Sequence, residues 1–120
     1  MIKNLFINSD KRLYLDKREI HALVARLKND LHFTVESLSV NFVDDETILT
    51  LNRKYLNHNN TTDIITFNYS GSLNDLDGEI FISVDDAYTN SHRFKTTLNK
   101  EIIRLMSHGI LHLLGYNDIE

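Results

Sequence analysis

One helix constrains the fold of this chain more than any other segment. Apolar residues recur at helical spacing from residue 98 to residue 114, which makes this the most apolar helix predicted in the 120-residue sequence and predicts that it is buried. Two polar rings interrupt it, because His108 and His112 are four residues apart and so lie on one face, about 6 Å apart along the axis. The fold must therefore bury this helix and also provide polar surroundings for two imidazoles on one of its faces.

The end of this helix suggests a metal site. Gly115 fits the left-handed position that ends a helix, and it directs a turn that delivers the carboxylate of Asp118. Two histidines and a carboxylate with one open position are typical of a catalytic metal site rather than a structural one. Spacing alone is weak support, since among six histidines a pair four apart arises by chance on the order of one time in four. Two hydrogen-bonded histidines without a metal are an equally good interpretation at this point.

The composition narrows the class of protein. The sequence has no cysteine, so disulfides and thiolate ligands are excluded and any metal must bind to nitrogen and oxygen. No apolar run approaches the length of a membrane span, and the first residues lack the apolar stretch of a secretory signal. We expect one domain, residues 1–120, in the cytoplasm and with no membrane partner.

The charge argues against a protein that coats nucleic acid without specificity. The net charge is −4, and no Lys or Arg occurs between Tyr55 and His92, where six carboxylates fall. Binding along a phosphate backbone needs clustered basic residues. An anionic substrate could be bound only locally.

Helical and alternating spacing, caps and turn residues predict the remaining elements. In chain order they are a strand at 5–7, a helix at 17–30 with the capping box Asp16 and Glu19, a strand at 38–43, a helix from Asp44 or Asp45 to about Tyr55, strands at 64–69 and 79–84, and a helix from Asp85 or Asp86 to about Phe94. The linker between the last two strands is long for a tight hairpin, which leaves their pairing open. We expect an α+β fold of mixed α/β type, a single layered domain with one mixed four-stranded sheet covered by helices and the histidine helix at its centre.

Three segments carry a resemblance to a known family. They are LNRKYLNHNNTTDIITF at 51–67, LDGEIFIS at 76–83 and SHGILHLLGYND at 107–118. In this order they resemble the YbeY family of metal-dependent endoribonucleases, with its segments LNxxYRxxDxPTDVLSF, LGDIxI and HGxLHLxGYDH. Because the chain stops two residues after Asp118, we expect it to lack a C-terminal helix that would shelter the site.

The resemblance implies a set of metal ligands. It assigns one divalent ion per chain, expected to be zinc, to His108, His112 and the position after the GYN turn, which is Asp118 here and histidine in most of the family. Carboxylate is a competent zinc ligand. Two histidines and a carboxylate also suit iron, nickel or manganese, so the metal stays open.

The resemblance also raises three residues as candidate substrate contacts. The family has an arginine where this chain has Leu56, and Arg53, three residues earlier, is either its substitute or an ordinary exposed arginine. Asp63 either orients a ligand histidine or only begins a strand. His58 either takes part as an acid or substrate contact or is a solvated loop histidine.

The function implied is cleavage of single-stranded RNA, in maturation of the 3′ end of small-subunit ribosomal RNA and in ribosome quality control. A water activated by the metal would attack the phosphodiester, and no catalytic residue beyond it is assigned. The expected partners are ribosomal RNA and the ribosome or a ribosomal protein, and not DNA. The alternative is a metal-stabilised ribosome-assembly or RNA-binding factor that does not cut. A peptidase is disfavoured, because Gly109 stands where HExxH enzymes have their glutamate.

Overall fold

The chain folds around one sheet, and the computed structural model describes residues 2–9, 15–57 and 62–116. The elements are β1 (Leu5–Ser9), α1 (Lys17–Leu31), β2 (Thr34–Val43), α2 (Asp45–Leu51), the π-helical turn η1 (Asn52–Leu56), β3 (Ile64–Asn68), β4 (Asp75–Ser83), α3 (Val84–Arg93) and α4 (Leu98–Leu113). Their order and types confirm the predicted α+β class.

The sheet is mixed and four-stranded, as predicted. Its strand order is β1-β2-β4-β3, with β1, β2 and β4 parallel and β3 antiparallel to β4. The pairing left open by the long linker exists, in the register Ile64 with Ile82 and Asn68 with Gly78. The antiparallel strand β3 therefore forms one edge of the sheet, next to β4.

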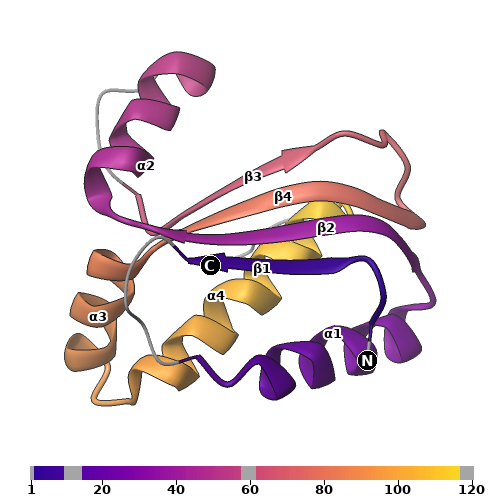
Figure 1. Ribbon diagram of the computed structural model, residues 1–120, viewed down its shortest axis with the longest axis horizontal. Coiled ribbons are helices and arrows are strands. Elements are labelled where there is room, and N and C mark those ends of the chain that lie inside the picture. The colour runs from indigo at the N-terminus through magenta and orange to yellow at the C-terminus, as the bar shows by residue number, and fades with distance from the viewer. Residues whose placement is uncertain (1, 10–14, 58–61, 117–120) are drawn as a thin grey trace.

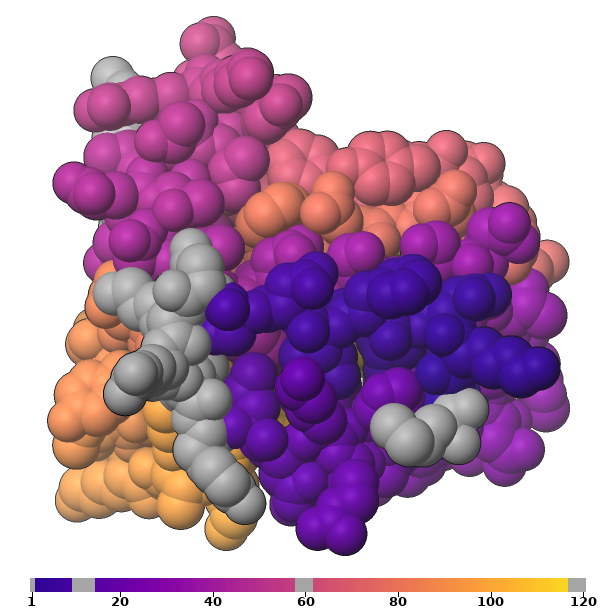
Figure 2. All heavy atoms as spheres, in the orientation of Figure 1, coloured from indigo at the N-terminus to yellow at the C-terminus, as the bar shows by residue number. Residues whose placement is uncertain are grey.

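Helices α1, α3 and α4 lie against one face of the sheet, and α2 rises from the other face at one end (Figure 1). The main core lies between the sheet and the first group of helices, where inward residues of β2 and β4, such as Val40 and Ile80, are fully buried. A smaller cluster of Val43, Ile48 and Ile65 lies on the opposite face. Figure 2 shows α2 projecting beyond the rest of the molecule. This agrees with the small size of the cluster through which α2 packs on the sheet.

Helix α4 crosses the centre of the main core, as predicted. Its first turn is capped by Thr97, whose hydroxyl accepts from the amide of Lys100 at 3.1 Å. Its end is closed by Gly115 at φ +89°, with the amides of Gly115 and Tyr116 donating to the carbonyls of His112 and Leu111. α4 spans 16 residues. In the described ranges, no helix combines the length and apolar character needed to cross a membrane.

The strand predicted at 38–43 begins four residues earlier, because Thr34 and Val35 pair with Asp75 and Leu76 of β4. Two more predicted boundaries are wrong for identifiable reasons. β4 begins at Asp75 rather than Glu79, because Asp75 and Asp77 lie outward on a strand whose alternate residues, such as Leu76, are buried. Carboxylates on an outward face resemble a polar loop in sequence. α3 is capped by Ser83 and not by Asp85 or Asp86, since the Ser83 hydroxyl accepts from the Asp86 amide at 3.1 Å.

The predicted helix from residue 44 or 45 to Tyr55 is divided. Asp44 caps it, accepting from the Thr47 amide at 2.9 Å. The α-helix ends at Leu51, and Asn52–Leu56 form the π-helical turn η1, which is followed by Asn57 with φ 57°. Such turns occur inside helices and are often found at functional sites. In this segment the chain carries Arg53 and Leu56, both exposed.

Candidate active site

A polar stripe runs along one side of α4, from Glu101 through Arg104 to His108 and His112. These residues are three or four apart, so they lie on neighbouring turns of one helix face. The imidazole rings of His108 and His112 are nearly parallel, at 9°, with centroids 6.2 Å apart. His108 is half-buried and His112 is exposed. Both rings are thus accessible from one side of the helix.

The ring geometry suits two ligands of one ion. Zinc binds imidazole nitrogen at ~2 Å, so two rings on one ion have centroids ~5 to 6 Å apart. The observed 6.2 Å needs only a small side-chain rotation to reach that range. Both rings offer nitrogen donors, which suit zinc and the later divalent transition metals.

A cleft of about 480 Å³ opens beside this stripe. Its walls come from the start of β3, the end of α3 and the stripe itself, and the lining residues are Thr62, Asp63, Ile64, Thr66, Phe94, Arg104, Leu105, His108 and His112. The two histidines therefore share one solvent-filled space with a carboxylate, a guanidinium and two hydroxyls. This combination can hold a cation and an anionic substrate at the same time.

A buried hydrogen-bond network supports the wall of the cleft. Glu101 is 1% exposed, and its two carboxylate oxygens accept from Nε and Nη2 of Arg104 at 2.8 and 2.7 Å. The amide of Asn90, on α3, donates to both Glu101 and Asp63, at 3.3 and 3.2 Å. Asn90 therefore joins α4 to the start of β3. The network therefore links Arg104 and Asp63, which both line the cleft.

Gly109 explains why this helix lacks the glutamate of HExxH peptidases. A Cβ at Gly109 would lie 2.9 Å from Cδ1 of Ile64 and 3.1 Å from Cδ1 of Ile80. The position faces the sheet and not the cleft, because α4 packs on β3 and β4 there. A glutamate at 109 would have its carboxylate in the apolar core, which is unfavourable without a partner.

Carboxylates gather behind the cleft, at the ends of β2 and β4. Asp86 is the most affected, because burial and the nearby carboxylates of Asp45 and Asp63 raise its pKa to about 6. Ser83 Oγ donates to Asp45 at 2.5 Å, and Asp85 accepts from the amide of Asp45 at 3.0 Å. Negative charge is thus concentrated on one side of Asp63.

Known proteins resemble this chain over most of its length. Residues 6–120 match the family described as Endoribonuclease YbeY. The chain belongs to the YbeY endoribonuclease family. An Endoribonuclease YbeY of Parabacteroides distasonis is 49% identical over 81 residues, which are 68% of this chain and 56% of the relative. That of Bacteroides fragilis is 40% identical over 87% of this chain and 74% of the relative.

The fold agrees with this family membership. A protein of Thermotoga maritima solved in solution superposes with a TM-score of 0.63 and 25% identity, over 94% of this chain and 73% of that one. The chain thus spans little more than half of the first relative and about three quarters of the second and of this neighbour. The resemblance found in the three sequence segments is confirmed, because the chain belongs to the YbeY family.

The predicted YbeY site residues are only partly within the described structure. His108, His112 and Asp63 lie together in the cleft, whereas the described lining does not include Arg53 or Leu56. Asp118 and His58 fall outside the described residues. Among the residues that are described, no group of three or more His, Asp or Glu side chains could hold a metal ion. The role of each ligand therefore stays a prediction.

Sequence reasoning missed Arg104, Glu101 and Asn90. The first two could have been found by extending the histidine spacing backwards, because Arg104 is four residues and Glu101 seven residues before His108. Asn90 carries no such signal, since it comes from α3 and its role depends on how α3 packs against α4. The site is thus built from a local stripe and a contact distant in sequence.

Proposed function

We propose that this chain is a single-strand-specific metallo-endoribonuclease. It would act in maturation of the small-subunit ribosomal RNA 3′ end and in ribosome quality control, in the cytoplasm. Family membership supports the reaction class, since the relatives carry the name endoribonuclease. The single observation that carries the proposal is the cleft in which the parallel His108 and His112 rings share one space with Arg104.

Different residues of the site would bind the metal and orient its ligands. His108 and His112 would hold one divalent ion, zinc for preference, with Asp118 as a third ligand. When bound, such an ion lowers the pKa of water and offsets negative charge on a phosphoryl group. Asp63, held by the Asn90 amide at 3.2 Å, would orient a ligand histidine by accepting its second ring N–H. The rRNA and a ribosomal protein are the proposed partners.

The chain's own residues also favour phosphodiesters over peptides. The cleft holds an arginine, which suits a phosphate. The helix has no room for the peptidase glutamate, because Gly109 packs against Ile64 and Ile80. Both features arise from the way α4 lies on the sheet, and they do not depend on which metal is bound.

The test compares matched histidine variants. Metal-loaded native protein, His112→Ala and His92→Ala are incubated with single-stranded RNA containing the 3′ precursor of small-subunit rRNA, and bound metal is measured by elemental analysis. His92 is an exposed histidine on α3. Cleavage by the native and His92→Ala proteins, lost with the metal in His112→Ala, is the expected result. Binding without cleavage by the native protein would contradict an enzyme and favour a non-catalytic assembly factor.

A further inference from the structure

Phe94 and Arg104 form an unusual pair at the margin of the cleft. Phe94 ends α3 and Arg104 lies on α4, and the Arg104 Cζ is 5.6 Å from the centroid of the Phe94 ring. Both residues line the same cleft as His108 and His112. An aromatic ring and a guanidinium in contact are thus presented beside the candidate metal ligands.

Arg104 is held in place by a group that the protein buries at a cost. A buried carboxylate is unfavourable unless it is paired and hydrogen bonded. Glu101 is 1% exposed, and besides the Asn90 amide it accepts from the edge of the guanidinium carrying Nε and Nη2. The Arg104 side chain nevertheless remains 49% exposed. A guanidinium held on one edge by Glu101 and still half exposed in the cleft loses little conformational entropy on binding an anion.

Phe94 is 54% exposed, although a phenylalanine gains from burial. Single exposed apolar side chains are common on protein surfaces, so the exposure of Phe94 alone does not indicate a binding site. What distinguishes Phe94 is its place, because its ring lines the cleft and lies against the Arg104 guanidinium. Aromatic rings in such positions stack nucleobases without regard to sequence, and an adjacent arginine adds a cation–π contribution.

The charges of the cleft make Arg104 the natural phosphate contact. Asp63 also lines the cleft, and the carboxylates of Asp45 and Asp63 both act on the nearby Asp86. A phosphate entering the cleft is therefore repelled by these carboxylates. Of the described residues that line the cleft, Arg104 is the one Lys or Arg. It also offers a cation where the family's arginine is replaced by Leu56.

We propose that Phe94 and Arg104 bind single-stranded RNA at this cleft, with the ring stacking one base and the guanidinium contacting the adjacent phosphate. The RNA as ligand rests on the proposed function. The pair places the strand next to His108 and His112, so that the backbone and not the base sequence is recognised.

The experiment measures RNA binding by fluorescence anisotropy on metal-loaded protein. The probe is a labelled single-stranded RNA of ~12 nucleotides with methylated ribose 2′ oxygens, checked by gel to be intact. Phe94→Leu keeps an apolar side chain but removes the ring, and roughly tenfold weaker binding is expected. Glu101→Gln combined with Arg104→Gln removes the cation without leaving a buried charge. It should weaken binding and reduce the slope of log K against log salt by about 0.7.

The matched control is Arg18→Ala, which removes an arginine that is 91% exposed on α1. It should bind the probe within about twofold of native. Native binding by Phe94→Leu, or an unchanged salt slope in the double variant, would overturn the proposal, and so would an equal loss in Arg18→Ala. Equal metal content and thermal midpoints show that the variants are folded.

Failure of the pair and failure of the proposed function give different results. If the native protein cleaves RNA and the Phe94→Leu protein has the native KM, RNA binding by Phe94 and Arg104 is contradicted, whereas the endoribonuclease function is supported. If the native protein cleaves no RNA while both variants lose binding, RNA binding by the pair is supported and the endoribonuclease function is contradicted.

Discussion

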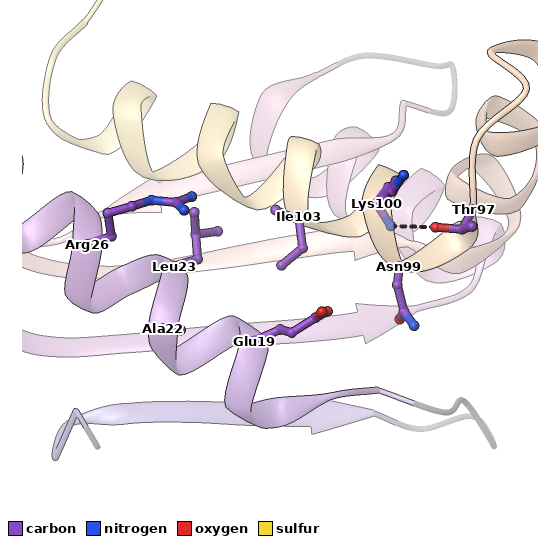
Figure 3. Close-up of a pocket in the computed structure, with 8 residues that line it drawn as sticks. All are labelled: Glu19, Ala22, Leu23, Arg26, Thr97, Asn99, Lys100 and Ile103. Carbon is purple, nitrogen blue, oxygen red and sulfur yellow. Dashed lines mark hydrogen bonds between the residues drawn. The ribbon is translucent and has the colours of Figure 1, made fainter.

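Two hollows of nearly equal size flank α4, and only one of them has the chemistry of a site. The groove between α1 and α4 has a volume of about 530 Å³, against about 480 Å³ for the histidine cleft. Figure 3 shows Leu23 and Ile103 approaching each other across this groove, with charged side chains at its margins. The one hydrogen bond drawn there, from the Lys100 amide to Thr97, caps the helix. Its residues are accounted for by folding alone.

The cleft contains features that folding does not require. A fully buried glutamate lies on α4 facing α3, and two imidazoles occupy one face of the most apolar helix. Replacing a buried ion pair by apolar residues often leaves stability unchanged or raises it. A protein that keeps such a pair beside parallel histidine rings has a use for the arginine it holds. The comparison teaches that costly polar groups, rather than volume, identify the site.

The largest contrast between the two hollows is expected in metal binding. His108→Ala or His112→Ala should weaken zinc binding by more than ~100-fold, because even a partner outside the ligand shell is worth about 10- to 100-fold. RNA cleavage should be lost with it. Lys100→Ala, in the groove, should leave both unchanged, since its cap contact uses the backbone. Titration with a zinc indicator measures this. Stoichiometric tight zinc in His108→Ala would remove that residue from the site.

The next contrast concerns the space on the two sides of α4. Gly109→Glu should lower the free energy of unfolding by on the order of 4 kcal/mol, because it inserts a carboxylate among Ile64 and Ile80 in the core. Ala22→Glu introduces the same side chain at the groove, where Ala22 is exposed. It should change stability by less than ~0.5 kcal/mol. Urea unfolding compares the two. Equal stabilities would mean that α4 does not pack on the sheet at Gly109.

Breaking the buried pair should have a smaller effect than filling the core. Glu101→Ala removes the partner that fixes Arg104, and a loss of ~2 kcal/mol in unfolding free energy is expected from the lost charged hydrogen bonds, since the remaining Arg104 is 49% exposed. Glu19→Ala, an exposed glutamate in the first turn of α1, should cost ~0.5 kcal/mol. Chemical denaturation distinguishes the two. A cost for Glu101→Ala no larger than that for Glu19→Ala would mean that the pair contributes little.

The same two sides show what sequence could predict. Helix α4, its end at Gly115 and the two facing histidines followed from a strong helical period and one glycine. The role of Arg104 did not, because it depends on Glu101 being buried against Asn90 of α3, a contact between helices. Local spacing determines which residues share a helix face, whereas burial of that face is decided by tertiary packing.

The strands and the second helix also show that local spacing is predictable from sequence whereas tertiary packing is not. β4 was predicted four residues short because Asp75 and Asp77 are typical of loops, and only pairing with β2 shows that they lie outward on a strand. The π-helical turn at Asn52–Leu56 has no sequence signal of its own, since its residues are ordinary helix formers. Both features are set by neighbours in space.

The smallest contrast is a dependence on pH on the acidic side of the cleft. The folded protein raises the pKa of Asp86 from 3.8 to about 6, through burial and the charges of Asp45 and Asp63. The folded state therefore binds this proton more tightly than the unfolded state. The contribution of the protonated Asp86 carboxyl to stability is fully present below pH 3.8. It is lost as the pH rises through about 6.

Asp86→Asn removes that cost and should stabilise the protein at pH 7. The gain should stay below ~1 kcal/mol, because water screens a partly exposed group. It should shrink between pH 6 and 4, where the native carboxyl takes up its proton, so measurement at pH 4 is the internal control. Thermal unfolding at the two pH values is the measurement. A gain of the same size at both pH values would show that repulsion from Asp45 and Asp63 does not destabilise the folded protein. The buried carboxylate of Glu101 would then be the main unfavourable term in the free energy of forming the cleft.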